Sequence, residues 1–539
     1  MNLQLLSLFV AILSIPVVAR AGEPDTTAVD LIMEEGMERS QVMDILSWMT
    51  DVHGPRLTGS PGYKEAAGWA VDKLTEMGLS NSHLEGWGPF GRGWQLERHT
   101  AHVITPQPFP LVSLPKAWSP GTDGKIEGDV ILVDVPNDSV LQTFKGRLGG
   151  KFVMLDPERA VSPHFSGDAA RRSEEELLRL ANAQPPEDRQ WRRRERTEEQ
   201  QQKRLADYRR LLMAEEEGAL ALLDVSRGDR GNIFLQQAGV PSHPDTPRSA
   251  RTRAWQEDAP DILPQVSLTA EHYNRIVRML EKGQRVRMEM ETEVRFFEVD
   301  SGYNIIAELP GSDLADQVVM IGAHFDSWHG ATGATDNGAG SAICMEAMRI
   351  LKATGLQPRR TIRIGLWGGE EQGLLGSEAY VKRHFGEQTG PDSNKVTKYK
   401  IEAERLSAYY NLDNGAGKIR GVYMQGNEAV RPYFREWLKP FESLGASTLS
   451  IANTGSTDHV AFDELGLPGF QFIQDGLEYF STTHHSTMDF YDRVVEDDLK
   501  QAATILARFA YETAMMDERL PRKPMKNVML EWAPEVFSK

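Results

Sequence analysis

The sequence holds a single cysteine, Cys344, among 539 residues, so no disulfide can form within the chain. Cys344 lies in an apolar stretch with helical spacing, which indicates a packed core thiol rather than a nucleophile. The sequence also lacks an excess of positive charge, because it contains 60 Lys and Arg residues against 78 Asp and Glu residues. Its formal net charge is −18. This balance argues against nucleic acid and anionic membrane surfaces as partners.

Long apolar runs are missing everywhere except at the N-terminus. Residues 3–18 are almost wholly apolar, and Ala19-Arg20-Ala21 has the small-x-small pattern of a signal-peptide cleavage site. We therefore expect a signal peptide at 1–21, a secreted or periplasmic protein, and no membrane contact after cleavage. A retained anchor is the alternative, but the run is short for a membrane span. Secretion without disulfides favours a bacterial periplasm or exterior.

The length of the chain predicts two or three domains. Helical spacing at 41–52 and 63–77 opens the chain, with a turn-rich loop at 54–62 between them. From about 103 to 292, short β-like runs separated by Gly and Pro indicate a second, β-rich domain. From residue 304 onward, strands and helices alternate. This alternation predicts an α/β fold with a mostly parallel mixed sheet and helices on both faces.

A charged stretch at about 171–217 interrupts the β-rich region. It carries both charge signs, including Arg192-Arg193-Arg194, with leucines spaced along it. We interpret it as exposed helices that form a solvated arm, with a lid or a dimer contact as the alternative. Because acidic residues accompany the arginines, the stretch is weak evidence for nucleic-acid binding.

Acids and histidines fall where predicted strands end. These strands are expected at 318–323, 361–367, 407–412 and 469–473. The residues that follow them are His324 and Asp326, Glu370 and Glu371, Asp413, and His484 and His485. A glycine-rich loop at 330–340 adds Asp336 just before a predicted helix at 341–354. In open α/β sheets, ligands bind outside the carboxyl ends of the strands, so these side chains converge on one edge.

Two imidazoles and three carboxylates among these residues make a two-metal set. Its members are His324, Asp336, Glu371, Asp413 and His485. Such donors suit zinc, with cobalt or manganese as substitutes, and one carboxylate would bridge the two ions. A catalytic site keeps a position open for water, whose pKa the metal brings toward about 7. Each residue alone fits a simpler role in a turn, a cap or the surface, so only their joint placement favours metal binding.

Two further acids are assigned catalytic roles. Asp326 is two residues from His324 on the same face of a strand, so its carboxylate can accept the second imidazole N–H and fix the tautomer. Glu370 and Glu371 are adjacent and cannot both point the same way in an extended chain. One can therefore bind metal while the other, Glu370, acts as general base toward water and then protonates the leaving amine.

Four motifs resemble those of the zinc exopeptidases that include bacterial leucyl aminopeptidases and glutamate carboxypeptidase, most closely the plasma glutamate carboxypeptidase branch. The motifs are Ala323-His324-Phe325-Asp326-Ser327-Trp328, Gly333-Ala334-Thr335-Asp336-Asn337-Gly338-Ala339-Gly340, Leu366-Trp367-Gly368-Gly369-Glu370-Glu371-Gln372-Gly373 and His484-His485-Ser486. The match covers about 304–520, and 54–78 resembles the family's N-terminal opening. The resemblance implies the zinc-peptidase fold at 22–102 and 293–539, with a protease-associated domain inserted at 103–292.

The resemblance also implies roles for individual residues. Asp336 would bridge two zinc ions, the other four ligands would complete their coordination, and Glu370 would be the general acid and base. His485 is preferred over His484 because the family's ligand precedes a Ser or Thr and an acid four positions on, here Asp489. Three residues are substrate-side candidates of lower rank, namely Asp458, His459 and His484.

The expected function is that of a secreted zinc exopeptidase, an aminopeptidase or dipeptidase that hydrolyses peptides with water activated by two zinc ions. An acidic site attracts a free α-amine, and no arginine cluster for a substrate carboxylate is identifiable, which favours aminopeptidase action. The alternatives are a carboxypeptidase of the same family, a single-zinc acyltransferase resembling glutaminyl cyclase, and a non-catalytic binding ectodomain as in the transferrin receptor. The last would have lost metal ligands that this sequence keeps. A homodimer is also compatible with the sequence.

Overall fold

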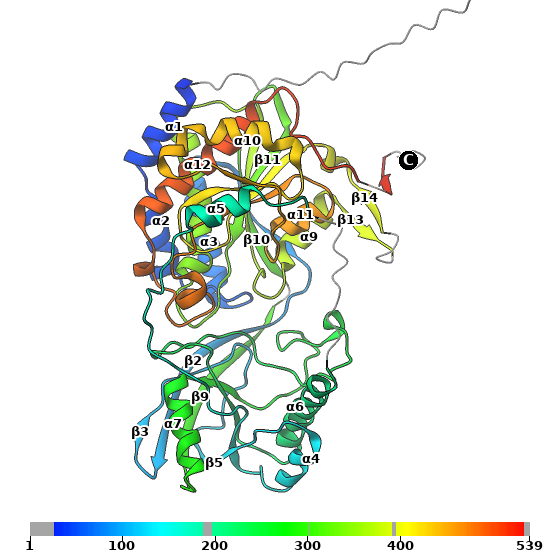
Figure 1. Cartoon of the computed structure of the whole chain (residues 1–539). Coiled ribbons are helices and arrows are strands. Elements are labelled where there is room, and N and C mark those ends of the chain that lie inside the picture. The colour runs from blue at the N-terminus through cyan, green and yellow to red at the C-terminus, as the bar shows by residue number, and fades with distance from the viewer. Residues whose placement is uncertain (1–25, 187–196, 300, 391–394, 526, 533–539) are drawn as a thin grey trace, which may run out of the picture.

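Two eight-stranded sheets, one above the other, form the framework of the molecule (Figure 1). The computed structural model describes residues 26–186, 197–299, 301–390, 395–525 and 527–532. The predicted signal peptide at 1–21 and the arginines 192–194 lie outside the described residues. Within the described residues, no helix combines the length and the apolar character that crossing a bilayer requires.

The first sheet is mixed, with four parallel strands at its centre. Its order is β1-β10-β12-β11-β15-β18-β16-β17. Strands β12, β11, β15 and β18 run parallel, and β10 is antiparallel to both of its neighbours, β1 and β12. Strand β16 is antiparallel to β18 and parallel to β17. The bounds are β1 Ser80–Trp87, β10 Gly302–Leu309, β11 Leu314–His324, β12 Arg360–Trp367, β15 Leu406–Asn411, β16 Ile419–Tyr423, β17 Thr448–Ser450 and β18 Gly469–Gln474. The predicted α/β fold with its mostly parallel mixed sheet is confirmed.

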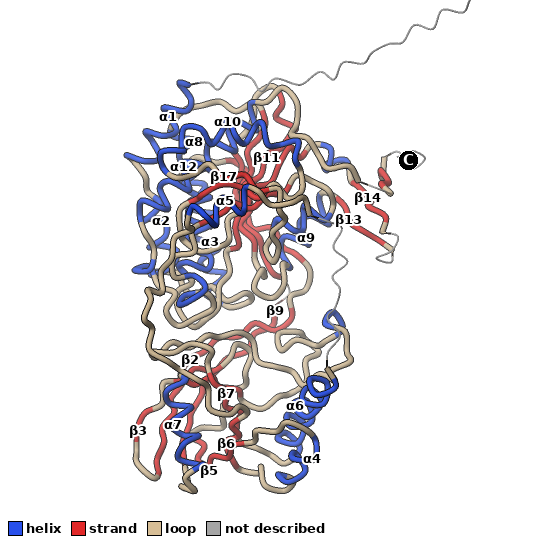
Figure 2. The backbone as a smooth tube through the Cα atoms, in the orientation of Figure 1, coloured by secondary structure: helices blue, strands red, loops and turns tan. Residues whose placement is uncertain are grey.

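Helices cover both faces of this sheet (Figure 2). One face shares a core with α1 (Thr26–Glu38), α2 (Val42–Ser47), α3 (Pro61–Glu76), α8 (Ala339–Ala353), α10 (Arg431–Leu438) and α12 (Glu496–Met515). The other face packs against α9 (Leu375–His384) and α11 (His459–Glu464). Helix α8 is buried over almost its whole length, because its small and apolar side chains fill the space between the sheet and α12. We refer to this sheet and its helices as the first unit.

The second sheet has the order β3-β2-β9-β5-β6-β7-β8-β4. Its bounds are β2 Gly91–Thr105, β3 Phe109–Pro110, β4 Ser113–Pro115, β5 Ile126–Leu132, β6 Lys151–Met154, β7 Ala221–Val225, β8 Gln265–Leu268 and β9 Arg287–Val299. Side chains of β6 alternate between two cores, one shared with α7 (Ala270–Glu281) and one with α4 (Asp138–Leu141) and α6 (Glu198–Glu216). The strands and loops of residues 91–299 are called the second unit.

The predicted insert boundaries at 103 and 292 fall inside the two longest strands of the second unit. Strands β2 and β9 pair antiparallel from Gly91–Val299 to Thr105–Arg287, so the sheet extends beyond both predicted boundaries. The two strands also carry the chain between the units. The assignment of this unit as a protease-associated domain stays a prediction. A small third sheet adds β13 (Gly386–Thr389), β14 (Val396–Tyr399) and β19 (Val528–Leu530).

The described part of the charged stretch does not form a solvated arm. Helix α5 (Glu174–Ala181) docks beside β17 of the first unit, and α6 packs on the second sheet through Ala206 and Ala214. Ahead of α5, Arg171 donates to Asp475 at 2.9 Å and to Asp498 at 2.7 Å. The buried face of α6 consists of small residues among many charged ones. The sequence therefore shows no apolar stripe that would predict packing of α6 on a sheet.

Candidate active site

The five predicted metal ligands meet at the carboxyl end of the four parallel strands. Glu371 follows β12, His324 ends β11, Asp413 follows β15, and His485 lies in the loop after β18. Asp336 lies in the turn between β11 and α8. Because these four strands are neighbours in the sheet, their connecting loops open at one edge and bring distant residues together.

Asp336 stands between two clusters of donors. His324 Nε2 lies 3.4 Å from Asp336 Oδ1 and 3.4 Å from Asp413 Oδ1. On the other side, His485 Nε2 lies 3.4 Å from Asp336 Oδ2 and 2.8 Å from Glu371 Oε2. Each cluster thus has one imidazole nitrogen, one carboxylate of its own and one oxygen of Asp336. A carboxylate that bridges two cations needs this division of its oxygens.

The donor set fits divalent cations such as zinc. Asp336 Oδ2 and Glu371 Oε1 are buried and lack a hydrogen-bond partner among the described residues. The ligand atoms of His324, Asp336 and Asp413 all lie within 4.8 Å of one another. Buried carboxylates are costly unless they are paired or coordinate a metal, and these nitrogen and oxygen donors match the preferences of zinc.

Glu370 lies in the same pocket and belongs to neither cluster. Its main-chain N–H donates to Asp326 Oδ1 at 3.2 Å, while the N–H of Glu371 donates to Asp326 Oδ2 at 3.3 Å. Burial raises the pKa of Glu370 well above its usual range. A carboxyl group with a raised pKa can both accept and return a proton near neutral pH, as general acid–base catalysis requires.

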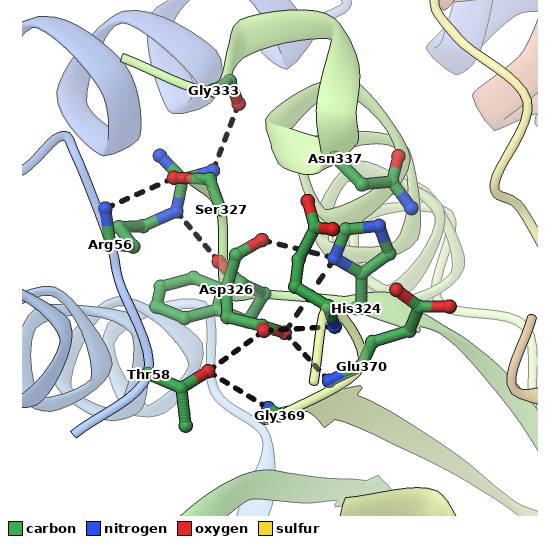
Figure 3. Close-up of polar contacts among 12 residues, drawn as sticks. Arg56, Thr58, His324, Asp326, Ser327, Gly333, Asn337, Gly369 and Glu370 are labelled. Carbon is green, nitrogen blue, oxygen red and sulfur yellow. Dashed lines mark hydrogen bonds and ion pairs between the residues drawn. The ribbon is translucent and has the colours of Figure 1, made fainter. Parts of the chain in front are cut away.

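Asp326 lies beside His324 as predicted, and its main-chain carbonyl oxygen is closer to the imidazole than its carboxylate is (Figure 3). His324 Nδ1 lies 3.0 Å from the main-chain carbonyl oxygen of Asp326 and 3.6 Å from its carboxylate, so the carbonyl fixes the tautomer. The carboxylate instead accepts the Thr58 hydroxyl at 2.8 Å and the two glutamate N–H groups. Strand β11 ends at His324, so the rule that alternate residues share a face does not extend to Asp326.

The buried Arg56 is a supporting residue that the sequence did not reveal. Its guanidinium donates to the carbonyl oxygens of Phe325 at 2.7 Å, Thr332 at 2.8 Å and Gly333 at 2.9 Å (Figure 3). Burial lowers the pKa of Arg56 to about 10, which leaves the group charged at neutral pH. Arg56 thus ties the chain after His324 to the turn that carries Asp336. Its only sequence signal is a cation inside the turn-rich loop at 54–62.

Three more side chains hold the ligands in place. Asp489 accepts the main-chain N–H of Asp336 at 3.1 Å, and the Tyr479 hydroxyl donates to Asp336 Oδ1 at 3.0 Å. Trp328 Nε1 donates to Glu371 Oε2 at 2.6 Å. Trp328 and Asp489 lie within or beside the quoted motifs, whereas Tyr479 reaches the site only through folding of the loop after β18.

The lower-ranked candidates separate into two groups. His484 lines the pocket, and its ring stacks on His485 with centroids 3.7 Å apart. It also offers a ring nitrogen within 4.8 Å of ligand atoms on Asp336 and His485. Asp458 and His459 are fully buried at the start of α11, where burial raises the pKa of Asp458 to about 7 and lowers that of His459 to about 4. They lie behind the pocket wall rather than in its lining.

The pocket, of about 650 Å³, has walls from both units. The second unit contributes Gln236, Arg248 and Arg253. Among the described residues, neither guanidinium has an ion-pair partner. Two arginines therefore line the pocket opposite the acidic edge of the first sheet. The sequence did not show this, because both lie in the long connection between β7 and β8, whose one short 3-10 helix, Arg248–Ala250, gives no hydrophobic pattern.

The chain is similar to known peptidases. Residues 304–510 match the model of peptidase family M28. Carboxypeptidase Q of Mus musculus is 26% identical over 489 residues, which cover 90% of this chain and 88% of that protein. The crystal structure of a peptidase M28 precursor from Shewanella amazonensis is 25% identical, with a TM-score of 0.65, and the match covers 93% of this chain and 99% of that one. A zinc aminopeptidase from Bacillus subtilis shares the fold at 19% identity, with a TM-score of 0.53 and coverage of 88% of this chain and 95% of that one.

Proposed function

Because this chain belongs to peptidase family M28 through residues 304–510, and is therefore a metallo-exopeptidase, we propose that it is secreted and works with two zinc ions. The observation that carries the two-ion proposal is the division of the Asp336 oxygens between two clusters. The zinc aminopeptidase of Bacillus subtilis supports the choice of metal. Support for secretion comes from the apolar run and small-x-small pattern within residues 1–21.

The residues of the site divide the catalytic work. His324, Asp413 and Asp336 would hold one ion, and His485, Glu371 and Asp336 the other. When bound, zinc supplies a Lewis acid that polarises the scissile carbonyl and lowers the pKa of water. Glu370 takes a proton from the attacking water and returns it to the leaving amine. Asp326 fixes the backbone of the two adjacent glutamates by accepting hydrogen bonds from their main-chain N–H groups.

The acidic edge of the pocket favours substrates with a free α-amine. The side chains of Asp336, Glu370, Glu371 and Asp413 line the pocket together. With both ions in place, the metal charge would neutralise Asp336, Glu371 and Asp413. Glu370 would be the acid left to attract a cationic peptide terminus, which supports aminopeptidase or dipeptidase action.

Recognition of a substrate carboxylate is the second candidate, and Arg248 and Arg253 support it. An unpaired guanidinium binds a carboxylate through two parallel N–H bonds, so the wall of the second unit suits a free C-terminus. A pocket with acids on one wall and arginines on the other suits a short peptide with both ends free. The name of the relative carboxypeptidase Q agrees with this reading.

Substitution of Arg253 tests carboxylate recognition. We expect Arg253→Gln to lower kcat/KM for a dipeptide with a free carboxylate by about 10–100-fold, because a hydrogen bond to a charged group contributes about 1.5–3 kcal/mol. The same dipeptide as its C-terminal amide should be little affected. Arg295→Gln serves as the matched control, because Arg295 on β9 pairs with Glu97 on β2, outside the pocket. Equal losses on the acid and the amide would refute this role.

Metal removal tests the proposed function as a whole. A panel of dipeptides and aminoacyl anilides is assayed before and after dialysis against a chelator, and again after zinc is restored. We expect hydrolysis to disappear with the metal and to return with about two equivalents of zinc per chain. A chelated sample that cleaves as fast as the untreated protein would end the proposal.

N-terminal sequencing of the protein exported by a bacterial host tests cleavage after Ala21.

A further inference from the structure

A segment of the second unit lies against the loop that carries the ligand His485. Main-chain hydrogen bonds run from Thr487 N to Ile233 O at 2.8 Å and from Leu235 N to His485 O at 2.7 Å. The two segments run antiparallel where Phe234 faces Ser486. The loop after β18 is therefore anchored to the second unit through its own backbone.

His485 needs such anchoring because its backbone is left-handed, with φ of 57°. This conformation is unfavourable for any residue with a Cβ atom, and it persists only where surrounding contacts over-determine it. The N–H of Leu235 on the His485 carbonyl is one such contact. A second comes from Asn232, whose side-chain amide donates to Thr482 O at 2.7 Å at the other end of the loop.

The ring of His485 is also contacted from the second unit. Its Nε2 faces Asp336 and Glu371, and its Nδ1 lies 3.2 Å from the side-chain amide of Gln236. An imidazole that coordinates through Nε2 carries its proton on Nδ1, so its partner must accept a hydrogen bond. The amide of Gln236 presents its oxygen at the same place after rotation by 180° about χ3.

The other ligand histidine has an equivalent partner within the first unit. His324 Nε2 faces its cluster, and its Nδ1 lies 3.0 Å from the carbonyl oxygen of Asp326. Both rings thus direct Nε2 to the clusters and Nδ1 to an amide group. For His324 that group belongs to the main chain of its own loop, and for His485 it belongs to the second unit.

We propose that Gln236 is a positioning residue for the metal centre, which the second unit completes by fixing the backbone and the ring of His485. This inference rests on the proposed two-metal centre. It gives the second unit a function apart from forming the pocket wall, because the ligand geometry of one ion depends on residues 232–236. Among the described residues, no hydrogen bond or ion pair joins His324 or Asp413 to that segment, so the other ion would depend on it only through the shared Asp336.

Zinc affinity of the full chain tests the role of Gln236. Titration against a coloured chelator yields two dissociation constants, one for each ion. We expect Gln236→Leu to raise one constant by about 10-fold, at the low end of the effect of removing a hydrogen-bond partner from a ligand histidine, since Gln236 is exposed. The other constant should stay unchanged. Gln236→Glu keeps an acceptor for Nδ1–H and should restore the wild-type constant to within about threefold.

Gln284→Leu is the control, because Gln284 is an exposed glutamine at the far end of α7 from the pocket. Circular dichroism of the metal-free variants shows whether each one is folded. Wild-type constants in Gln236→Leu, an equal loss in Gln284→Leu, or no recovery in Gln236→Glu would overturn the inference. If the wild-type protein bound no second zinc ion, the two-metal proposal itself would fail, which is a distinguishable result.

Discussion

Glu370→Gln is expected to lower kcat by about 10²–10⁴-fold while the protein keeps both metal ions. The amide has nearly the same size as the carboxyl, so the main-chain N–H bonds of this loop to Asp326 should survive. A glutamine side chain cannot take a proton from water or return it to the leaving amine. Steady-state kinetics on a dipeptide, together with elemental analysis for zinc, measure the two parts of this expectation.

Glu378→Gln provides the matched control for Glu370. Glu378 is an exposed acid on α9, just beyond the same loop and outside the pocket lining. Its substitution should leave kcat within about twofold of wild type, as is usual for surface changes. Near-wild-type turnover by Glu370→Gln would refute the acid and base role. Loss of zinc from Glu370→Gln would show that Glu370 is a ligand instead.

Asp336→Asn should have the largest effect on metal binding. The carboxylate serves both clusters, so its loss removes charge and a donor from each of them. Two cations at one edge need the shared negative charge between them, and the neutral amide does not supply it. We expect zinc content to fall from about two equivalents to below one, and hydrolysis to fall by about 10³-fold or more.

The comparison with Asp413→Asn makes this prediction specific. Asp413 contacts only the His324 cluster, so its substitution should remove one zinc equivalent and leave the other in place. Elemental analysis and the chelator titration measure both variants side by side, and circular dichroism shows whether they are folded. If Asp336→Asn kept two tightly bound ions, or lost no more zinc than Asp413→Asn, Asp336 would not be the bridge.

The core of the α/β fold and the convergence of its acids could be predicted from the sequence for a simple reason. Strands β11, β12, β15 and β18 are short apolar runs, with His324 at the end of β11, acids closely after β12 and β15, and His485 farther along the loop after β18. Their parallel order then determines where those side chains meet. The predicted helix at 341–354 matches α8, because its apolar residues recur at helical spacing.

Residues that reach the site across the fold could not be found in this way. Arg56, Gln236 and Arg253 lie in irregular segments without hydrophobic periodicity, and only tertiary packing brings them to the metal ligands. The sequence predicted the Asp326 carboxylate beside His324, and the two lie 3.6 Å apart, but it missed the closer main-chain carbonyl oxygen of Asp326 at 3.0 Å. The prediction applied the geometry of a strand beyond the residue at which β11 ends.

The enclosure of the lone cysteine makes the protein suited to fluorescence measurements. Cys344 is fully buried within α8, and burial raises the pKa of its thiol above the usual range. Because only an accessible thiolate reacts readily with maleimide dyes, the natural chain should remain unlabelled. Cysteines introduced at the exposed positions Lys64 and Glu199 would then be the only reactive pair. Energy transfer between dyes on α3 and α6 could follow any opening of one unit against the other during turnover.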